Sequence, residues 1–187
     1  MKTKLLLPVL LCATFLSFSQ TIWTGGGSDI NWNNSDNWST NMVPSITDDV
    51  EIPGGFTVTI GGAASCESLE LKGNAILNID SGNGLFSTQP SLFEAGTTVN
   101  WARGTINCSL LVNQGTINLT SSADKLFETS TLVTNTGSIN IIGSGNLFLR
   151  DGTVLNNQID GTIDMGADDG NIDNLGGLPI LNNAGII

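Results

Sequence analysis

The sequence is poor in the residues on which most enzyme chemistry depends. It contains no histidine, and only 12% of its residues are charged. The absence of histidine excludes the commonest general base, the commonest metal ligand and the usual serine triad. Basic residues are also few, 6 against 17 acidic ones, which gives a formal net charge of −11. Nucleic acids and anionic membranes need clustered Lys and Arg, so the composition disfavours both as partners.

Long helical patterns are missing as well. Beyond residue 19, no stretch of ten or more residues has the apolar period of a helix, and none is apolar enough to span a membrane. The chain instead contains 23 glycines and much Asn, Ser and Thr, which is the composition of short strands joined by tight turns. A hydrophobic content of 40% argues against disorder.

Residues 1–19 have the features of a secretory signal peptide. Two lysines precede the apolar run from Leu5 to Leu16, and small residues follow it before a cut at Gln20. The alternatives are a membrane anchor, for which the run is short, and a lipoprotein signal, for which Cys12 comes early. We therefore predict a secreted protein.

The most informative feature is an internal repeat. Four segments share the pattern Gly-x-Ile, and their glycines are 22, 24 and 24 residues apart: Gly115-Thr-Ile117, Gly137-Ser-Ile139, Gly161-Thr-Ile163 and Gly185-Ile-Ile187. A period in this range is typical of a solenoid, in which each repeat buries its apolar side by stacking on its neighbours.

The runs between the turns are too short for helices and alternate apolar with polar residues. They predict an all-β, right-handed parallel β-helix, with the handedness taken from the general crossover preference. A β-sandwich is the alternative, but it does not need a motif to recur in the same columns. The predicted columns are Ile117, Ile139, Ile163 and Ile187; Leu119, Ile141 and Met165; Leu110, Leu132, Val154 and Ile180; and, on a second face, Leu126-Phe127 with Leu147-Phe148.

The chain divides into three parts by composition. After the signal peptide, residues 20–64 hold three of the four tryptophans, and we interpret them as an N-terminal cap followed by the first strands, Val50–Ile52 and Thr57–Ile60. Residues 65–187 are predicted to form rungs of about 22–24 residues. Before Gly104 the register cannot be assigned, because Gly104 lies only half a rung from Gly115.

Two polar features of the repeat invite a structural interpretation. Asn recurs at one corner, at Asn113, Asn135, Asn157 and Asn183, where it either stacks in a ladder or suits a left-handed turn. Cys108 follows Gly104 at the spacing of an inward residue, which favours a buried free thiol over a bond to Cys66.

The beginning of the mature chain resembles a known group of proteins. Trp23-Thr-Gly25, Trp32, Asn37-Trp38-Ser39, Pro44 and Asp48 to Pro53 resemble the opening of large secreted β-helix proteins of Bacteroidetes, and the chain is similar to passenger regions of bacterial adhesins and autotransporters. The resemblance implies an extracellular or cell-surface location and carries no catalytic residues.

No catalytic, cofactor-binding or metal-binding residue is predicted, and no cofactor. The alternative is a carbohydrate-active β-helix enzyme, a polysaccharide lyase or glycoside hydrolase, for which the nearest acidic group is Asp164, Asp168 and Asp169, with Arg103 and Arg150 as the only arginines. Calcium bound by the same turn oxygens is a further alternative. A glycan-binding module is the third, since the motif strands carry outward polar residues: Thr116, Asn118, Ser138, Asn140, Thr162 and Asp164. We predict a non-enzymatic structural or adhesin-like segment that contacts extracellular glycan or a host or cell surface.

The last motif copy stops on its isoleucine, Ile187, in the column of Ile117. An open rung exposes its core and its unpaired backbone groups. We therefore expect further rungs beyond residue 187, or a partner chain that continues the solenoid.

Overall fold

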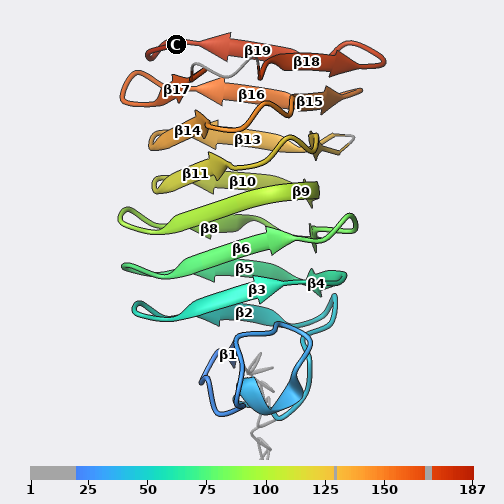
Figure 1. Cartoon of the computed structure of the whole chain (residues 1–187), viewed down its shortest axis with the longest axis vertical. Helices are drawn as coiled ribbons and strands as arrows, with labels where there is room; N and C mark the ends of the chain where they lie inside the picture. The colour runs from blue at the N-terminus through green and yellow to red at the C-terminus, as the bar shows by residue number, and fades with distance from the viewer. Residues whose placement is uncertain (1–19, 129, 167–169) are drawn as a thin grey trace, which may run out of the picture.

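The computed structural model describes residues 20–128, 130–166 and 170–187, and these form a stack of parallel β-rungs (Figure 1). The predicted signal peptide, residues 1–19, lies outside the described part. Within the described part the only helix is the 3-10 turn η1 (Ser35–Asn37). None of the described segments is a helix long and apolar enough to cross a membrane.

Each rung has three faces, and the strands of a face pair in parallel with those above and below. The first face contains β1 (Thr21–Ile22), β2 (Asp49–Ile52), β5 (Ser68–Leu71), β8 (Ser91–Phe93), β10 (Leu110–Asn113), β13 (Leu132–Asn135), β16 (Val154–Asn157) and β19 (Ile180–Asn183). The second contains β3 (Thr57–Ile60), β6 (Ile76–Asp80), the first half of β9 (Thr98–Cys108), β11 (Thr116–Leu119), β14 (Ser138–Ile141) and β17 (Thr162–Asp164). The third contains β4 (Ala64–Cys66), β7 (Leu85–Ser87), the second half of β9, β12 (Lys125–Phe127), β15 (Leu147–Arg150) and β18 (Ile172–Leu175). The predicted parallel β-solenoid is confirmed.

The alternation of the sequence explains why these short runs form strands. In β11 and β14 every second residue is buried, and the buried residues of successive rungs are register partners. Ile117, Ile139 and Ile163 form one predicted column, and Leu119 with Ile141 forms the next. Ile186 pairs with Thr162, which places Ile187 above Ile163 as expected. The interior is one continuous apolar core through the stack.

The early rungs are regular too, but they are not of constant length. Successive register partners on the second face are Val58, Leu77, Val99, Ile117, Ile139 and Ile163. The rungs therefore vary from 18 to 24 residues, so the predicted range of 22–24 is wrong for two of them, Val58 to Leu77 and Val99 to Ile117. The variation lies in the corners, whose length does not change the strand pairing.

Gly104 is not a copy of the motif glycine. It lies on the third face, paired with Lys125, while Val99 and Trp101 take the places of Ile117 and Leu119. The step of half a rung from Gly104 to Gly115 arises because β9 runs through the second and third faces without a break. Cys108 is nevertheless buried, as predicted, because it stacks on Ser87 in the third face.

Two predicted columns are displaced by one residue. On the first face Leu111, Val133 and Leu155 point inward, whereas the predicted Leu110, Leu132 and Val154 are half-buried and Ile180 is exposed. On the third face Leu126 pairs with Phe148 and Phe127 with Leu149, so Leu126-Phe127 does not align with Leu147-Phe148. A shift of one residue along a strand reverses which side chains face the core.

The motif glycines are required by close stacking rather than by an unusual backbone angle. A Cβ on Gly137 would collide with the carbonyl oxygen of Gly115, and one on Gly185 with that of Gly161. Glycine at this corner lets one rung lie directly on the next.

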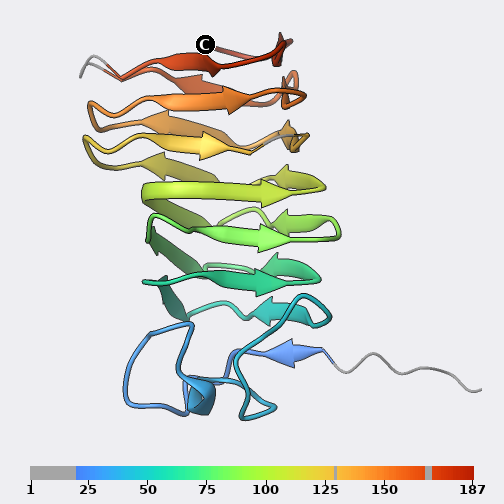
Figure 2. The same ribbon diagram turned by 90° about the vertical axis from the view of Figure 1, so that its right-hand side faces the viewer.

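The loops of the N-terminal segment lie below the first rung (Figure 2), and three buried tryptophans of this segment join the core. Trp23, Trp32 and Trp38 are at most 2% exposed, and the ring of Trp38 meets the other two edge-on at 4.9 and 4.8 Å. The indole N–H of Trp38 donates to the carbonyl oxygen of Trp32 at 2.8 Å. The Trp-rich cap is thus confirmed, and the first strands after it are β2 and β3, as expected.

Candidate functional site

A ladder of buried asparagines, called here the inner ladder, runs along the corner between the first and second faces. Asn113, Asn135, Asn157 and Asn183 end β10, β13, β16 and β19, and each Nδ2 donates to the Oδ1 of the next at 2.7 Å. Each Nδ2 also contacts the carbonyl oxygen of the motif glycine at 3.3 Å. Of the two interpretations left open by the sequence, the structure shows the ladder. The first three amides are at most 1% exposed, so their role is structural.

The inner ladder has a defined beginning. Asn113 lies above Phe93, and its Oδ1 has no hydrogen-bond partner. The apolar ring of Phe93 cannot donate to it. The unpaired carbonyl marks the rung at which the asparagine pattern starts.

A second ladder lies on the outer surface of the second face. Asn140 donates to Asn118 at 3.0 Å, Asn118 to Asn100 at 3.2 Å, and Asn100 to Asn78 at 3.0 Å. Asn78 donates in turn to the hydroxyl of Thr59 at 3.2 Å. We call the exposed side of these rungs the amide face; it comprises the outer ladder and the hydroxyl column beside it: Asn78, Asn100, Asn118, Asn140, Thr98, Thr116 and Ser138.

The amide face carries little charge. Its members are all half-buried and outward-pointing. Asp80, at its edge, forms an ion pair with Arg103 at 3.2 Å, and Asp164 continues the asparagine column one rung beyond Asn140. The predicted outward residues Thr116, Asn118, Ser138 and Asn140 belong to the amide face, and Thr162 and Asp164 continue its two columns on the next rung.

Of the acidic and basic residues considered for catalysis, the three that the structure describes, Asp164, Arg103 and Arg150, do not come together. Arg103 pairs with Asp80, and Arg150, two rungs away on the third face, pairs with Glu128 at 3.0 Å. The Oδ1 of Asp164 accepts from its neighbour Gly166 at 2.9 Å. Asp168 and Asp169 lie outside the described residues. Among the described residues, no three His, Cys, Asp or Glu side chains are grouped to hold a metal ion.

A hollow of about 460 Å³ is lined by residues of the cap loop and of the first rung. Asp29 lines it, and its carboxylate accepts from the backbone N–H of Asn31 and from the side-chain amide of Asn37, both at 2.9 Å. These bonds lower the pKa of Asp29 below its usual range. The carboxylate thus holds the cap loop in shape.

The two cysteines of the described chain are free and buried. Ser87 lies between them in the stack, paired with Cys66 on one side and with Cys108 on the other. Two rung spacings separate the thiols by about 10 Å, which is beyond the reach of a disulfide. Burial raises the pKa of Cys108 to about 11, and it raises the pKa of Cys66 as well. Both thiols are inert and protonated at neutral pH.

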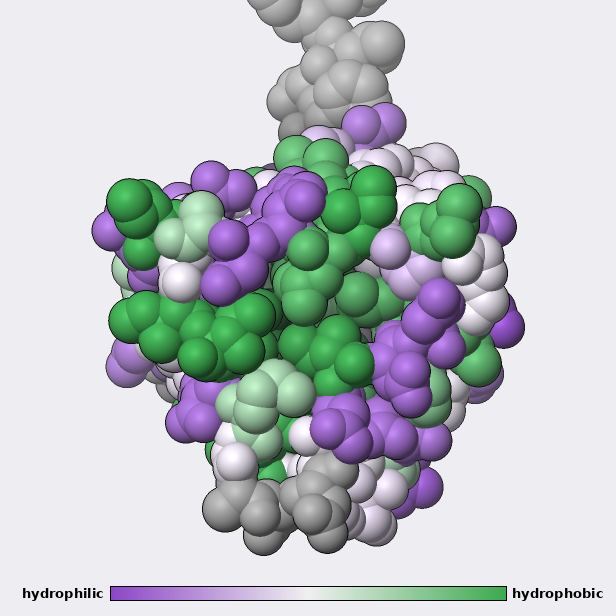
Figure 3. All heavy atoms as spheres, turned by 90° about the horizontal axis from the view of Figure 1, so that it is seen from above, coloured by the Kyte–Doolittle hydropathy of each residue, from purple (hydrophilic) through white to green (hydrophobic). Residues whose placement is uncertain are grey.

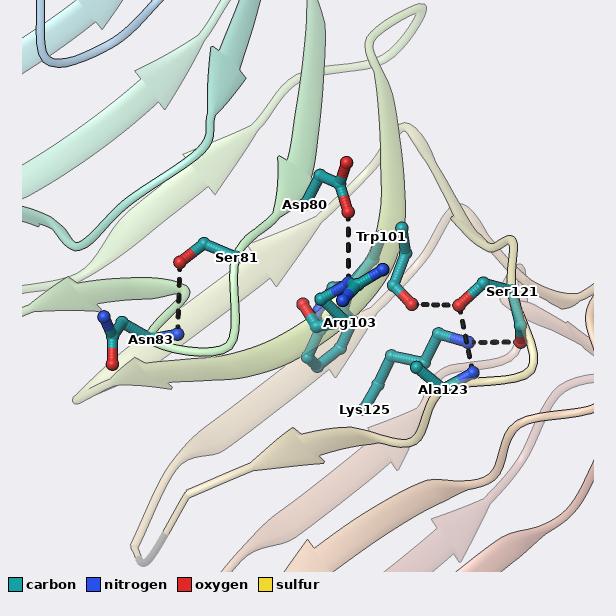
Figure 4. A network of polar contacts seen from close by, with 9 residues as sticks. Asp80, Ser81, Asn83, Trp101, Arg103, Ser121, Ala123 and Lys125 are labelled. Atoms are coloured by element: carbon teal, nitrogen blue, oxygen red, sulfur yellow. Dashed lines mark hydrogen bonds and ion pairs between the residues drawn. The ribbon is translucent and has the colours of Figure 1, made fainter.

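The structure also reveals a buried lysine that the sequence did not indicate. Lys125 is 0% exposed and points into the core at the start of β12. Its Nζ donates to the carbonyl oxygen of Ser121 at 2.8 Å (Figure 4). None of the ion pairs of the described residues includes it. Burial therefore lowers its pKa, and the nearby Asp124 offsets this only in part.

Gly104 is the register partner of Lys125 in the rung below. A Cβ on Gly104 would collide with the carbonyl oxygen of Ser81, so the missing side chain serves the close contact with the rung beneath it. The φ of Gly104, +85°, also suits glycine. The lysine stem packs as a long apolar side chain, and its ammonium group reaches a backbone carbonyl at the corner.

The fold defines the chain as a parallel β-solenoid. Comparison with protein-family models, with curated proteins and with solved structures found no match to this chain. The amide face has unpaired hydrogen-bonding groups, and the end of the stack opposite the tryptophan cluster has exposed apolar side chains.

Proposed function

We propose that the protein is a secreted or cell-surface structural segment with an adhesin-like role and no catalytic activity. The observation that carries this proposal is the continuous register of the rungs, in which Val58 to Ile163 form one column through six rungs. A stack whose repeats contact only their neighbours behaves as a rigid rod that can space or display other elements. The resemblance of residues 22–53 to the openings of secreted β-helix proteins supports the extracellular location.

The end of the stack opposite the tryptophan cap supports a role in further stacking. Apolar side chains gather at the centre of this end (Figure 3). Its exposed apolar residues are Leu175, Leu178, Ile180, Leu181, Ile186 and Ile187. A solenoid end of this kind offers unpaired strand edges and a cross-section of core. We propose that a second β-solenoid chain stacks on this apolar end.

Two measurements test the structural role. Labelling of intact cells with an antibody against the folded chain should detect the protein at the surface or in the medium. Screening the purified protein against uronate polymers and neutral glycans should give no turnover. Turnover that Asp164→Asn abolishes would overturn the proposal in favour of the carbohydrate-active enzyme.

A third measurement tests the open end. Leu178→Asp with Ile186→Asp places charge on the exposed end at two residues that lie outside the buried columns. The variant should remain folded and scatter light as a monodisperse monomer, whereas the unmodified chain should self-associate with increasing concentration. A monomeric unmodified chain at high concentration would contradict the stacking role.

A further inference from the structure

We propose that the amide face binds an extended neutral polysaccharide along the axis of the stack, one sugar unit to a rung. This inference rests on the proposed adhesin-like role and names the class of its ligand. Its basis is the chemistry of the outer ladder and the charge around it.

The outer ladder leaves each amide with half of its hydrogen-bonding capacity. A side-chain amide has two N–H donors and two carbonyl lone pairs. Asn118 uses one N–H toward Asn100 and one lone pair for Asn140. One donor and one acceptor therefore remain on the same planar group, on a half-buried side chain that points to solvent. An adjacent donor and acceptor match a pair of neighbouring sugar hydroxyls, which can donate and accept together.

The hydroxyl column adds a second contact on each rung. Thr98, Thr116 and Ser138 lie two residues before the ladder asparagines and are register partners of one another. Their hydroxyl oxygens form no hydrogen bond within the described residues. Each of the three central rungs thus offers an amide and a hydroxyl side by side.

The groups on this face are held in place before any ligand arrives. The amides are fixed by bonds of 3.0 to 3.2 Å to each other, and their strands are fixed by pairing on both sides. Binding then costs little side-chain entropy, which is the usual penalty at a polar surface. Preorganisation compensates for the modest strength of each neutral hydrogen bond.

Repeat length and charge select the ligand. Strands of adjacent rungs are about 4.8 Å apart, and an extended β-linked hexose chain advances by a similar distance with each sugar. The chain as a whole has a net charge of −11, and the amide face holds no free cation to pair with uronate or sulfate groups, since Arg103 is paired with Asp80. A polyanion would be repelled. The face therefore fits a neutral polymer.

Calorimetric titration of the full chain with cellohexaose, chitohexaose and hexagalacturonate tests the proposal. At least one neutral hexamer should bind, and hexagalacturonate should not. The double variant Asn100→Ala with Asn118→Ala should weaken neutral binding by about tenfold or more, because it removes the amides of two adjacent rungs. Asn156→Ala is the matched control: Asn156 points outward from the first face and is bonded to Asn182 at 2.8 Å. It should leave binding unchanged.

Each alternative result overturns the assignment. Absence of binding to both neutral hexamers, equal weakening by Asn156→Ala, or preference for hexagalacturonate would each refute a neutral-glycan face. If the chain bound no saccharide but shaped ice crystals, and the double variant did not shape them, the amide face would be assigned to the binding of ordered water instead. Urea denaturation of each variant separates loss of binding from loss of fold. Surface labelling and the turnover screen remain independent, so this inference can fail while the structural role stands.

Discussion

The two asparagine ladders have the same side chain and almost the same spacing, but they lie in different environments. The inner ladder is buried, and each of its amides contacts a glycine carbonyl as well as the next asparagine. The outer ladder is half-buried, and its amides contact mainly one another. A buried amide that loses its partner carries the full cost of desolvation, whereas an exposed one returns to water.

The ladders also point in opposite directions. Inner amides donate toward the C-terminal end of the stack, from Asn113 to Asn135, and outer amides donate toward the N-terminal end, from Asn140 to Asn118. The glycine carbonyl fixes the inner direction, because only the nitrogen of the amide can face it. The comparison teaches that one repeated residue type can hold rungs together at one corner and remain available for a ligand at another face.

The largest predicted effect comes from a substitution that places a charged side chain in the core. Ile139→Asp on β14 places an unpaired carboxylate in the core and should cost about 4 kcal/mol or more, since neighbouring rungs lose their packing. Urea denaturation followed by circular dichroism measures the loss. Asn140→Asp, one residue further and facing outward, is the matched control and should cost far less. A more harmful Asn140→Asp would reverse our assignment of the two sides.

Asn135→Ala should give the next largest loss. It removes the 2.7 Å bonds to Asn113 and Asn157 and leaves buried partners unsatisfied. We expect a loss of about 2–4 kcal/mol in the free energy of unfolding. Thr134→Ala, which changes the outward neighbour on the same strand, should have little effect. Equal losses for the two variants would mean that burial of the ladder contributes nothing.

Lys125→Met should stabilise the protein. The substitution keeps the long apolar shape and removes a buried charge that Asp124 balances only in part, for a gain of about 1 kcal/mol. Because the folded pKa of Lys125 is lowered, its penalty is complete below that pKa and decreases as pH rises toward the unfolded value. The advantage of Lys125→Met should therefore shrink between neutral pH and pH of about 10. A gain in stability that does not change with pH, or a loss of stability at neutral pH, would refute the inference that the buried ammonium group destabilises the folded state.

The smallest effects should come from the outer ladder. Asn118→Ala breaks two bonds on a half-exposed surface and should cost about 1 kcal/mol or less. Thr116→Ala, in the hydroxyl column, should stay within about 0.5 kcal/mol. Both are measured by urea denaturation beside Asn135→Ala. If Asn118→Ala matched Asn135→Ala, the contrast between the ladders would disappear.

The fold could be predicted because the same residue types recur at nearly constant steps along the sequence. Asn113, Asn135 and Asn157 recur at 22-residue steps, and every one ends a strand of the first face. Only half of the outer ladder could be predicted. Asn118 and Asn140 share the motif, whereas Asn78 and Asn100 have no motif glycine before them and Asn100 lies only 18 residues before Asn118. Variable corners hide a register that strand pairing keeps.

Lys125 could not be predicted from its own sequence context. The apolar neighbours Leu126 and Phe127 suggested the interior, and the true alignment is one residue away. The position follows from the alignment of β12 on β9, in which Lys125 is the register partner of Gly104, 21 residues earlier. Contacts between rungs are set by corner lengths, which no local pattern in the sequence specifies.

The rung-to-rung contact has a consequence for how such a chain can evolve. Residues 110–131 and 132–153 are both 22 residues long, and each presents to the next the same asparagine, the same glycine and the same isoleucine that it accepts from the one before. A duplicated copy of either unit would therefore stack on the same residue types on both sides. Unequal crossing-over within the gene could therefore lengthen or shorten the protein by whole units without any compensating substitution.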